Sequence, residues 1–152
     1  MALKDKLNDD LKVAMKARDQ VRLDTLRAIL SELKNLSIAQ KGEGGTGDLA
    51  EADELAVLSR ARKQREESIT AFRNGAREDL AKNEEAQLAI ILEYLPKQLS
   101  LDEVKAIVQG VIAELGATSK KDMGKVMGKL MPHLKGRFPG DQVKPVVESL
   151  LP

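Results

Sequence analysis

Residues 119–151, SKKDMGKVMGKLMPHLKGRFPGDQVKPVVESLL, hold the densest group of structural signals in this chain. They begin with Ser119 and Asp122, which are spaced to cap the N-terminus of a helix. Apolar residues then recur at intervals of three and four, as on the buried face of an amphipathic helix. These apolar residues are Met123, Val126, Met127, Leu130, Met131 and Leu134. The spacing predicts a helix with one face in a hydrophobic core.

A second face of the same helix carries lysines at steps of four, Lys121, Lys125 and Lys129. Gly124 and Gly128, also four apart, leave a strip of backbone without side chains beside these lysines. A row of cations next to a bare strip is suited to hold either a phosphate backbone or a second helix.

The two glycines need a physical reason, because each helical glycine costs about 1 kcal/mol relative to alanine. Close packing against a neighbouring helix is one reason. A kink is another, since the ring of Pro132 presses on the carbonyl of Gly128. Access for a ligand to the backbone is the third.

Positive charge is concentrated in residues 119–144, which contain seven cations and two acids, although the whole chain has a formal net charge of +1. No acid stands four residues from Lys125 or Lys129 to neutralise them. Such a local excess attracts phosphate groups, although a solubilising face would have the same composition. The seven cations are Lys120, Lys121, Lys125, Lys129, Lys135, Arg137 and Lys144.

The preceding residues predict two further short helices around this one. Ser100 and Glu103 form a capping box, and Gly116 is placed to end the helix that they start. Another apolar pattern begins near Asp141. Residues 97–152 are therefore expected to fold as a small three-helix domain, preceded by a hinge at residues 96–100 (PKQLS).

Residues 1–96 predict four helices arranged as two hairpins, over residues 3–17, 21–41, 48–74 and 77–96, with a short connection at residues 18–20. The chain contains only three aromatic residues, so the core must be aliphatic, which suits helices better than sheets. The predicted fold class is all-α, with an N-terminal helical domain at residues 1–96.

Two segments of this N-terminal domain resemble nucleotide or nucleic-acid motifs. Residues 42–47 (GEGGTG) match a dinucleotide-binding pattern, but a helix precedes them instead of a strand, so they are interpreted as a flexible hairpin loop. Residues 60–67 (RARKQREE) are basic but spread around the helix, with Arg62 spaced to pair with Glu66. A solvated helix is the preferred interpretation of that segment.

No group of residues in the sequence indicates catalysis. His133 is the only histidine, cysteine is absent, and no cluster has metal-ligand spacing. We therefore predict no catalytic residues, no metal and no cofactor. The chain has neither an apolar signal-peptide core nor a run of about 20 apolar residues, and a soluble cytoplasmic protein without membrane contact is expected.

Two segments, REDLAKNEEAQLAIILEYLPKQLS (residues 77–100) and KDMGKVMGKLMPHLKGRFPGDQVKPVVESLL (residues 121–151), resemble the YqeY family. The second segment is similar to the tail domain of GatB, the B subunit of the tRNA-dependent amidotransferase. The resemblance implies an all-helical protein whose tail domain engages tRNA. The positions that it marks are Lys121, Gly124, Lys125, Gly128, Lys135, Gly136 and Arg137; Lys120 and Lys129 join them on charge and geometry alone.

The first function hypothesis is a tRNA-binding accessory protein without chemistry of its own. Its partners would be tRNA or another structured RNA, together with amidotransferase or aminoacyl-tRNA synthetase proteins. Since stacking on aromatic side chains is scarce here, folded RNA is expected rather than unpaired bases. The second hypothesis is a helical protein-interaction module. Participation in glutamine-dependent carbon–nitrogen ligation, a label common in this family, is the third, and no residue here supports it as an activity of this chain.

Overall fold

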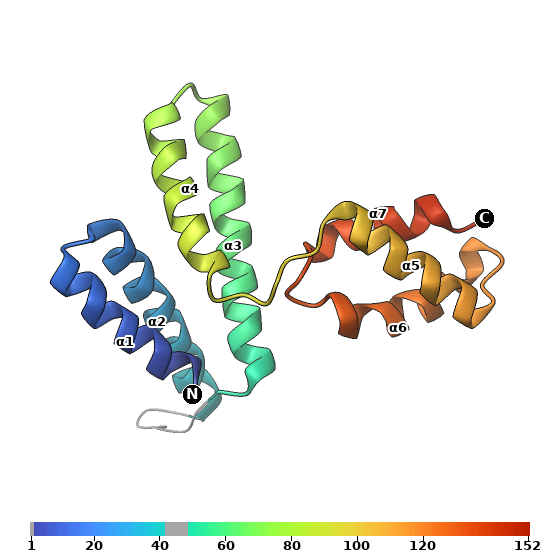
Figure 1. Cartoon of the computed structure of the whole chain (residues 1–152), viewed down its shortest axis with the longest axis horizontal. Helices are drawn as coiled ribbons and strands as arrows, with labels where there is room; N and C mark the ends of the chain where they lie inside the picture. The colour runs from blue at the N-terminus through green and yellow to red at the C-terminus, as the bar shows by residue number, and fades with distance from the viewer. Residues whose placement is uncertain (1, 42–48) are drawn as a thin grey trace. The chain divides into compact units, whose positions relative to one another are not determined.

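The computed structural model describes residues 2–41 and 49–152. All regular elements in these ranges are helices, which confirms the predicted all-α class (Figure 1). The loop predicted at residues 42–47 lies outside the described residues. In chain order the helices are α1 (Leu3–Ala17), α2 (Gln20–Lys41), α3 (Glu51–Asn74), α4 (Glu78–Leu92), α5 (Leu101–Leu115), the short 3-10 helix η1 (Lys120–Asp122), α6 (Met123–Leu134) and α7 (Gly140–Leu150).

Contacts divide the chain into two compact units, Met1–Leu95 and Pro96–Pro152. In the first unit, α1 packs on α2 and α3 packs on α4, so the helices pair as the two predicted hairpins. Helix α2 also contacts both α3 and α4 and thereby joins the hairpins. The buried core between them is aliphatic and consists of Leu7, Leu26, Ile29, Leu33, Val57, Leu58, Ala61, Ile90, Ile91 and Leu95.

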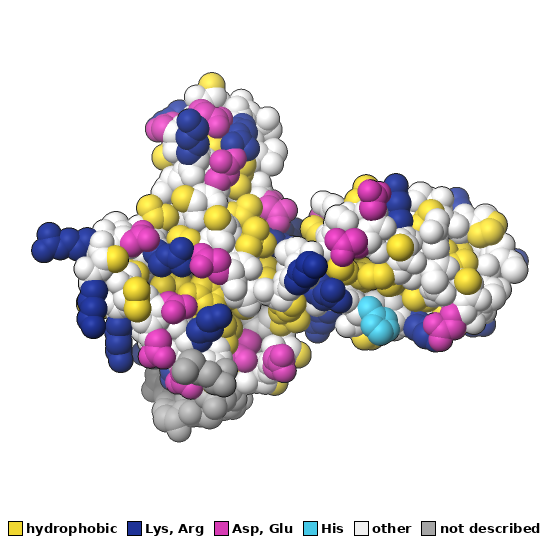
Figure 2. All heavy atoms as spheres, in the orientation of Figure 1, with side chains coloured by type: hydrophobic (Ala, Val, Ile, Leu, Met, Phe, Trp, Pro, Cys, Tyr) yellow, Lys and Arg dark blue, Asp and Glu magenta, His cyan; other side chains and the backbone are white. Residues whose placement is uncertain are grey.

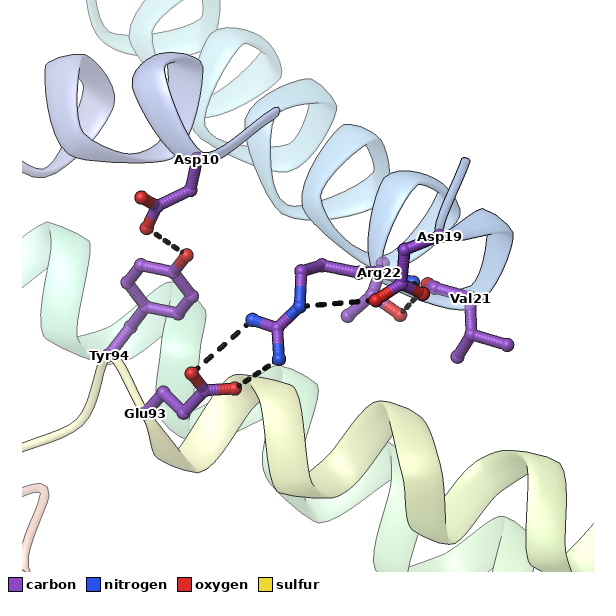
Figure 3. Close-up of polar contacts among 7 residues, drawn as sticks. Asp10, Asp19, Val21, Arg22, Glu93 and Tyr94 are labelled. Atoms are coloured by element: carbon purple, nitrogen blue, oxygen red, sulfur yellow. Dashed lines mark hydrogen bonds and ion pairs between the residues drawn. The ribbon is translucent and has the colours of Figure 1, made fainter. Parts of the chain in front are cut away.

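Helix α4 ends at Leu92 and not at Pro96 as predicted. The residue before a proline is disfavoured in the helical conformation, and so the chain leaves the helix early. Beyond the helix end, Arg22 of α2 forms an ion pair with Glu93 at 3.0 Å, and the Tyr94 hydroxyl donates a hydrogen bond to the Asp10 carboxylate (Figure 3). The end of α4 is thus fastened to α1 and α2 by two polar contacts.

The middle of α3 is less solvated than its composition predicted. Arg62 is only 7% exposed, and it pairs with Glu66 at 3.2 Å, as the spacing indicated. Arg65 turns towards α4 and donates to the Gln87 side chain at 2.9 Å. The prediction of a solvated helix is therefore wrong for Arg62 and for Arg65, which contacts α4, whereas the other two basic residues of the segment are exposed as expected.

The second unit is a three-helix bundle of α5, α6 and α7, in which each helix contacts the other two. The predicted capping box at α5 is confirmed: the Glu103 amide donates to Ser100 Oγ at 3.2 Å and the Ser100 amide donates to the Glu103 carboxylate at 3.3 Å. Gly116 ends α5 with a φ of 64°, a left-handed conformation that favours glycine. The buried core is composed of Leu99, Val104, Val108, Val111, Val126, Leu130, Leu134, Phe138, Val143, Val146, Val147 and Leu151.

Removing the Tyr94 hydroxyl should weaken the first unit. Burial, followed by the hydrogen bond to Asp10, raises the pKa of Tyr94 above its usual 10.0, so the hydroxyl stays a donor at neutral pH. We expect Tyr94→Phe to lower the free energy of unfolding by about 1 kcal/mol, the typical contribution of one hydrogen bond. Urea denaturation measures it, with Asp9→Asn as a control for the neighbouring exposed acid. Unchanged stability of Tyr94→Phe would contradict the role given to this contact.

The capping box should make α5 sensitive to acid. Hydrogen bonds from Ser100, its backbone amide first, lower the pKa of Glu103 below its usual 4.5. A lowered folded-state pKa contributes stability above about pH 4.5, and that contribution is lost as the pH falls through the lowered value. Wild type should melt above Glu103→Gln at pH 7, and the gap should close below pH 4.5. A gap that stays constant across this pH range, followed by circular dichroism, would refute the prediction.

Candidate nucleic-acid interface

Helix α6 presents one face to the core and the opposite face to water. Val126 and Leu130 are fully buried, whereas Gly124, Lys125 and Gly128 are exposed. Because successive helical residues are rotated by about 100°, the glycines and Lys125 lie on the side of the helix away from these apolar residues. Lys125 and the glycine strip therefore lie on one solvent-facing side. We call this side, together with Lys129 and with Lys121 of η1, the α6 surface.

The two glycines of the α6 surface do not pack against a neighbouring helix. A Cβ atom added to Gly124 or Gly128 would meet nothing within 4 Å. The packing explanation offered from the sequence is therefore wrong. Helix α6 also continues through Pro132 to Leu134 as one element. The proline removes the amide that would otherwise donate to the Gly128 carbonyl, so the local weakening of the helix is real but does not end it.

Lys129 differs from its two predecessors. Its ammonium group forms an ion pair with Glu114, in the last turn of α5, so this lysine is neutralised by a neighbouring helix. A search for acids four residues away considers partners on α6 alone, so it could not identify Glu114. Within the described residues, no ion pair joins Lys121 or Lys125 to an acid, and both side chains are exposed.

Three backbone amides just before α6 already donate hydrogen bonds to side chains of the chain itself. The amides of Thr118 and Ser119 donate to the Asp122 carboxylate at 3.0 and 3.4 Å, and the Lys121 amide donates to Ser119 Oγ at 3.3 Å. The predicted cap at Ser119 is thus confirmed, but it caps η1, immediately before α6. These three amides are therefore not free to bind an anion, whereas the side chains of Lys120 and Lys121 are exposed beside them.

Gly136 and Arg137 form the turn after α6. Gly136 is buried with a φ of 76°, and its carbonyl accepts a hydrogen bond from the Gln98 side chain at 2.7 Å. Arg137 donates to the carbonyls of Lys97 and His133 at 3.3 and 3.4 Å. These two positions therefore shape the turn, whereas the side chain of Lys135 is exposed.

The same turn holds the segment that was predicted to be a hinge. The Leu99 amide donates to the Arg137 carbonyl at 2.7 Å, so residues 97–99 are hydrogen-bonded into the second unit. Lys97 is brought beside Arg137, forty positions away in sequence. Lys97 was not among the predicted site residues, and no local pattern would have indicated it.

The displayed face of the molecule has basic and acidic side chains interspersed, without one extended field of a single sign (Figure 2). Among the described residues, no three His, Asp or Glu side chains gather closely enough to hold a metal ion. In the same residues, no helix is both long and apolar enough to cross a membrane. The strongest candidate interface is therefore the α6 surface, extended by Lys120 and Lys135.

Alanine substitutions in the open strip and in the turn should change the stability of the protein in opposite directions. Gly128→Ala should stabilise the protein by about 1 kcal/mol, because helical alanine is favoured and its Cβ meets no atom. Gly136→Ala should destabilise it by about 1–2 kcal/mol, because its backbone is left-handed. Chemical denaturation of both variants measures the difference. Loss of stability in Gly128→Ala would mean that the strip is occupied by the protein itself.

Three curated relatives cover most of this chain, and each is named "Altered inheritance of mitochondria protein 41, mitochondrial". The protein of Pyrenophora tritici-repentis is 34% identical over 134 residues, which is 87% of this chain and 71% of the relative. That of Saccharomyces cerevisiae is 31% identical over 138 residues, 83% and 71% of the two chains. That of Kluyveromyces lactis is 34% identical over 134 residues, 83% and 70%.

These names overturn one prediction. The cytoplasmic location expected from the sequence is wrong, because the relatives are named mitochondrial proteins. The expectation rested on the absence of cysteine, of a secretory signal and of an apolar span. Those features are equally compatible with a mitochondrial protein, so they do not distinguish the two compartments.

The resemblance noted in the sequence is confirmed by a family model. The model described as "Yqey-like protein" matches residues 4–151, nearly the entire chain and both compact units. The chain belongs to the YqeY-like family.

Proposed function

We propose that this protein binds structured RNA, with tRNA as the first candidate, through the α6 surface. The observation that carries the proposal is the pairing of two exposed lysines, Lys121 and Lys125, with a glycine strip that none of the described residues covers. Lys120 and Lys135 extend the positive charge beyond the two ends of α6.

The chemistry of such an interface is phosphate binding by ammonium groups. Lysine side chains bind phosphate as mobile point charges, and the lack of side chains at Gly124 and Gly128 lets a sugar-phosphate backbone approach the helix closely. The amides of Thr118 and Lys121, before α6, already donate within the cap of η1, so the proposed attraction at this end is carried by lysine side chains. Binding of this kind is electrostatic and falls steeply with salt.

The aromatic residues favour folded RNA over single strands. Phe138 is buried in the second unit, and the hydroxyl of Tyr94 is bonded to Asp10 in the first unit. Phe72, on α3, is partly buried. Since recognition of unpaired bases relies on exposed aromatic faces, shape and backbone contacts are the mode that this protein can use. A part in tRNA amidation would follow from RNA binding as an accessory role.

A helical protein-interaction module is the second candidate function. The same open glycine strip favours it, because helices approach each other most closely where side chains are absent. The amidotransferase and aminoacyl-tRNA synthetase proteins are its candidate partners. Charge reversal would leave such an association nearly intact, whereas Gly124→Leu would block it; RNA binding depends on the charges.

Charge reversal at two lysines of the second unit tests the RNA proposal. Lys125→Glu should weaken binding of bulk tRNA by roughly tenfold, since a contact to a charged group contributes about 1.5 kcal/mol or more. It should also lower the slope of log affinity against log salt by about 0.7–0.9, one phosphate contact. Filter binding at several salt concentrations measures both quantities.

The matched control is Lys144→Glu, an exposed lysine on α7 with the same change of charge. It should reduce affinity much less, because only the net charge of the protein changes. Equal weakening by the two substitutions, or no weakening by either, would reject the α6 surface as the RNA site.

A further inference from the structure

The acid that pairs with Lys129 occupies an unfavourable place in its own helix. Glu114 lies in the last turn of α5, where the helix dipole presents its negative end, and that turn contains no basic residue. A carboxylate there is disfavoured by the helix, whereas a lysine or arginine would be favoured. The stability of α5 therefore does not explain Glu114.

The pairing with Lys129 is accessible to an incoming anion. The side chains of Lys129 and Glu114 are 38% and 61% exposed. Exposed ion pairs exchange partners easily, because water solvates both charges when they separate. A phosphate that approaches Lys129 therefore meets the Glu114 carboxylate as a competitor for the same ammonium group.

We infer that Glu114 is a built-in competitor of phosphate at the α6 surface, which limits how many phosphates α6 holds; this inference rests on the proposed RNA-binding function. Lys121 and Lys125 contact RNA phosphates without displacing an acid, whereas at Lys129 a phosphate competes with the Glu114 carboxylate. A displaced Glu114 stays on α5 next to the bound phosphate and repels it.

Competition by Glu114 lowers the affinity of the protein for polyanions in general. Every additional neutralised phosphate raises affinity for any RNA, whatever its shape, and steepens the dependence on salt. An acid that withholds one of three lysines lowers this non-selective attraction. RNA molecules whose backbone also fits the open strip at Gly124 and Gly128 are then favoured in affinity over RNA molecules held by charge alone.

The test compares Glu114→Gln with Glu148→Gln in the full-length protein. Both remove one negative charge from the second unit, and Glu148 is an exposed acid on α7. Glu114→Gln should bind bulk tRNA about two- to fivefold more tightly than Glu148→Gln, the range of an exposed ion pair. Its salt slope should be steeper by about 0.7–0.9. Adding Lys129→Gln to Glu114→Gln should abolish both gains.

Each result decides between the two proposals. If wild type binds and Glu114→Gln binds no better than Glu148→Gln, the competitor is refuted and the RNA-binding function stands. If wild type does not bind but Glu114→Gln does, the competitor is supported and RNA binding by the native protein is refuted. If neither binds, both are refuted.

Thermal melting separates competition from a purely structural ion pair. Glu114→Gln should melt at or above the wild-type temperature, since loss of the ion pair is offset by relief at the end of α5. A lower melting temperature together with unchanged RNA affinity would make the contact a structural tie between α5 and α6 and overturn the inference.

Discussion

Burial of Val126, Leu130 and Leu134 determines which side of α6 faces water. Each side chain is 0–1% exposed, and burying one such residue contributes about 1.5–3 kcal/mol. Moving the buried positions by one residue towards the N-terminus would bring Lys125, Lys129 and His133 into the core in their place. The apolar stripe therefore fixes the outward position of Lys125 and of the bare strip without any contact made by those residues themselves.

Several backbone groups near the helix ends of the second unit are already hydrogen-bonded within that unit. The amides before α6 are bonded to Ser119 and Asp122, and those before α5 to Ser100 and Glu103. The turn after α6 is likewise closed by Arg137 and Gln98. The α6 surface, in contrast, offers the ammonium groups of exposed lysines and a strip of backbone without side chains. This combination favours recognition by charge and shape over recognition by directed backbone hydrogen bonds.

Local signals predicted the local structure well. The capping box at Ser100, the left-handed Gly116 and the apolar stripe of α6 each depend on residues within one or two helical turns, and all three are present. Contacts between distant residues were not predictable in the same way. The partner of Lys129 comes from another helix, and Lys97 reaches Arg137 only through the tertiary fold.

The same distinction explains the two errors about environment. Arg62 is polar in sequence but only 7% exposed in the fold, and its neighbour Arg65 contacts Gln87 of α4, which a later part of the chain supplies. The open glycines show the reverse: the sequence suggested that they pack against a helix, but no element in residues 2–41 or 49–152 reaches them. Whether a residue is covered is decided by which elements meet, and a helical period alone contains no information about that.

Two departures from local stability meet near α6, and this coincidence is the strongest argument for a functional surface. Gly124 and Gly128 each cost about 1 kcal/mol in a helix, and no packing against the described part of the chain offsets that cost. Glu114 stands at the wrong end of α5 and touches the lysine row. Conflicts between local preference and fold gather at functional sites, where stability is given up for binding. A surface that only kept the protein soluble would need neither the glycines nor the misplaced acid.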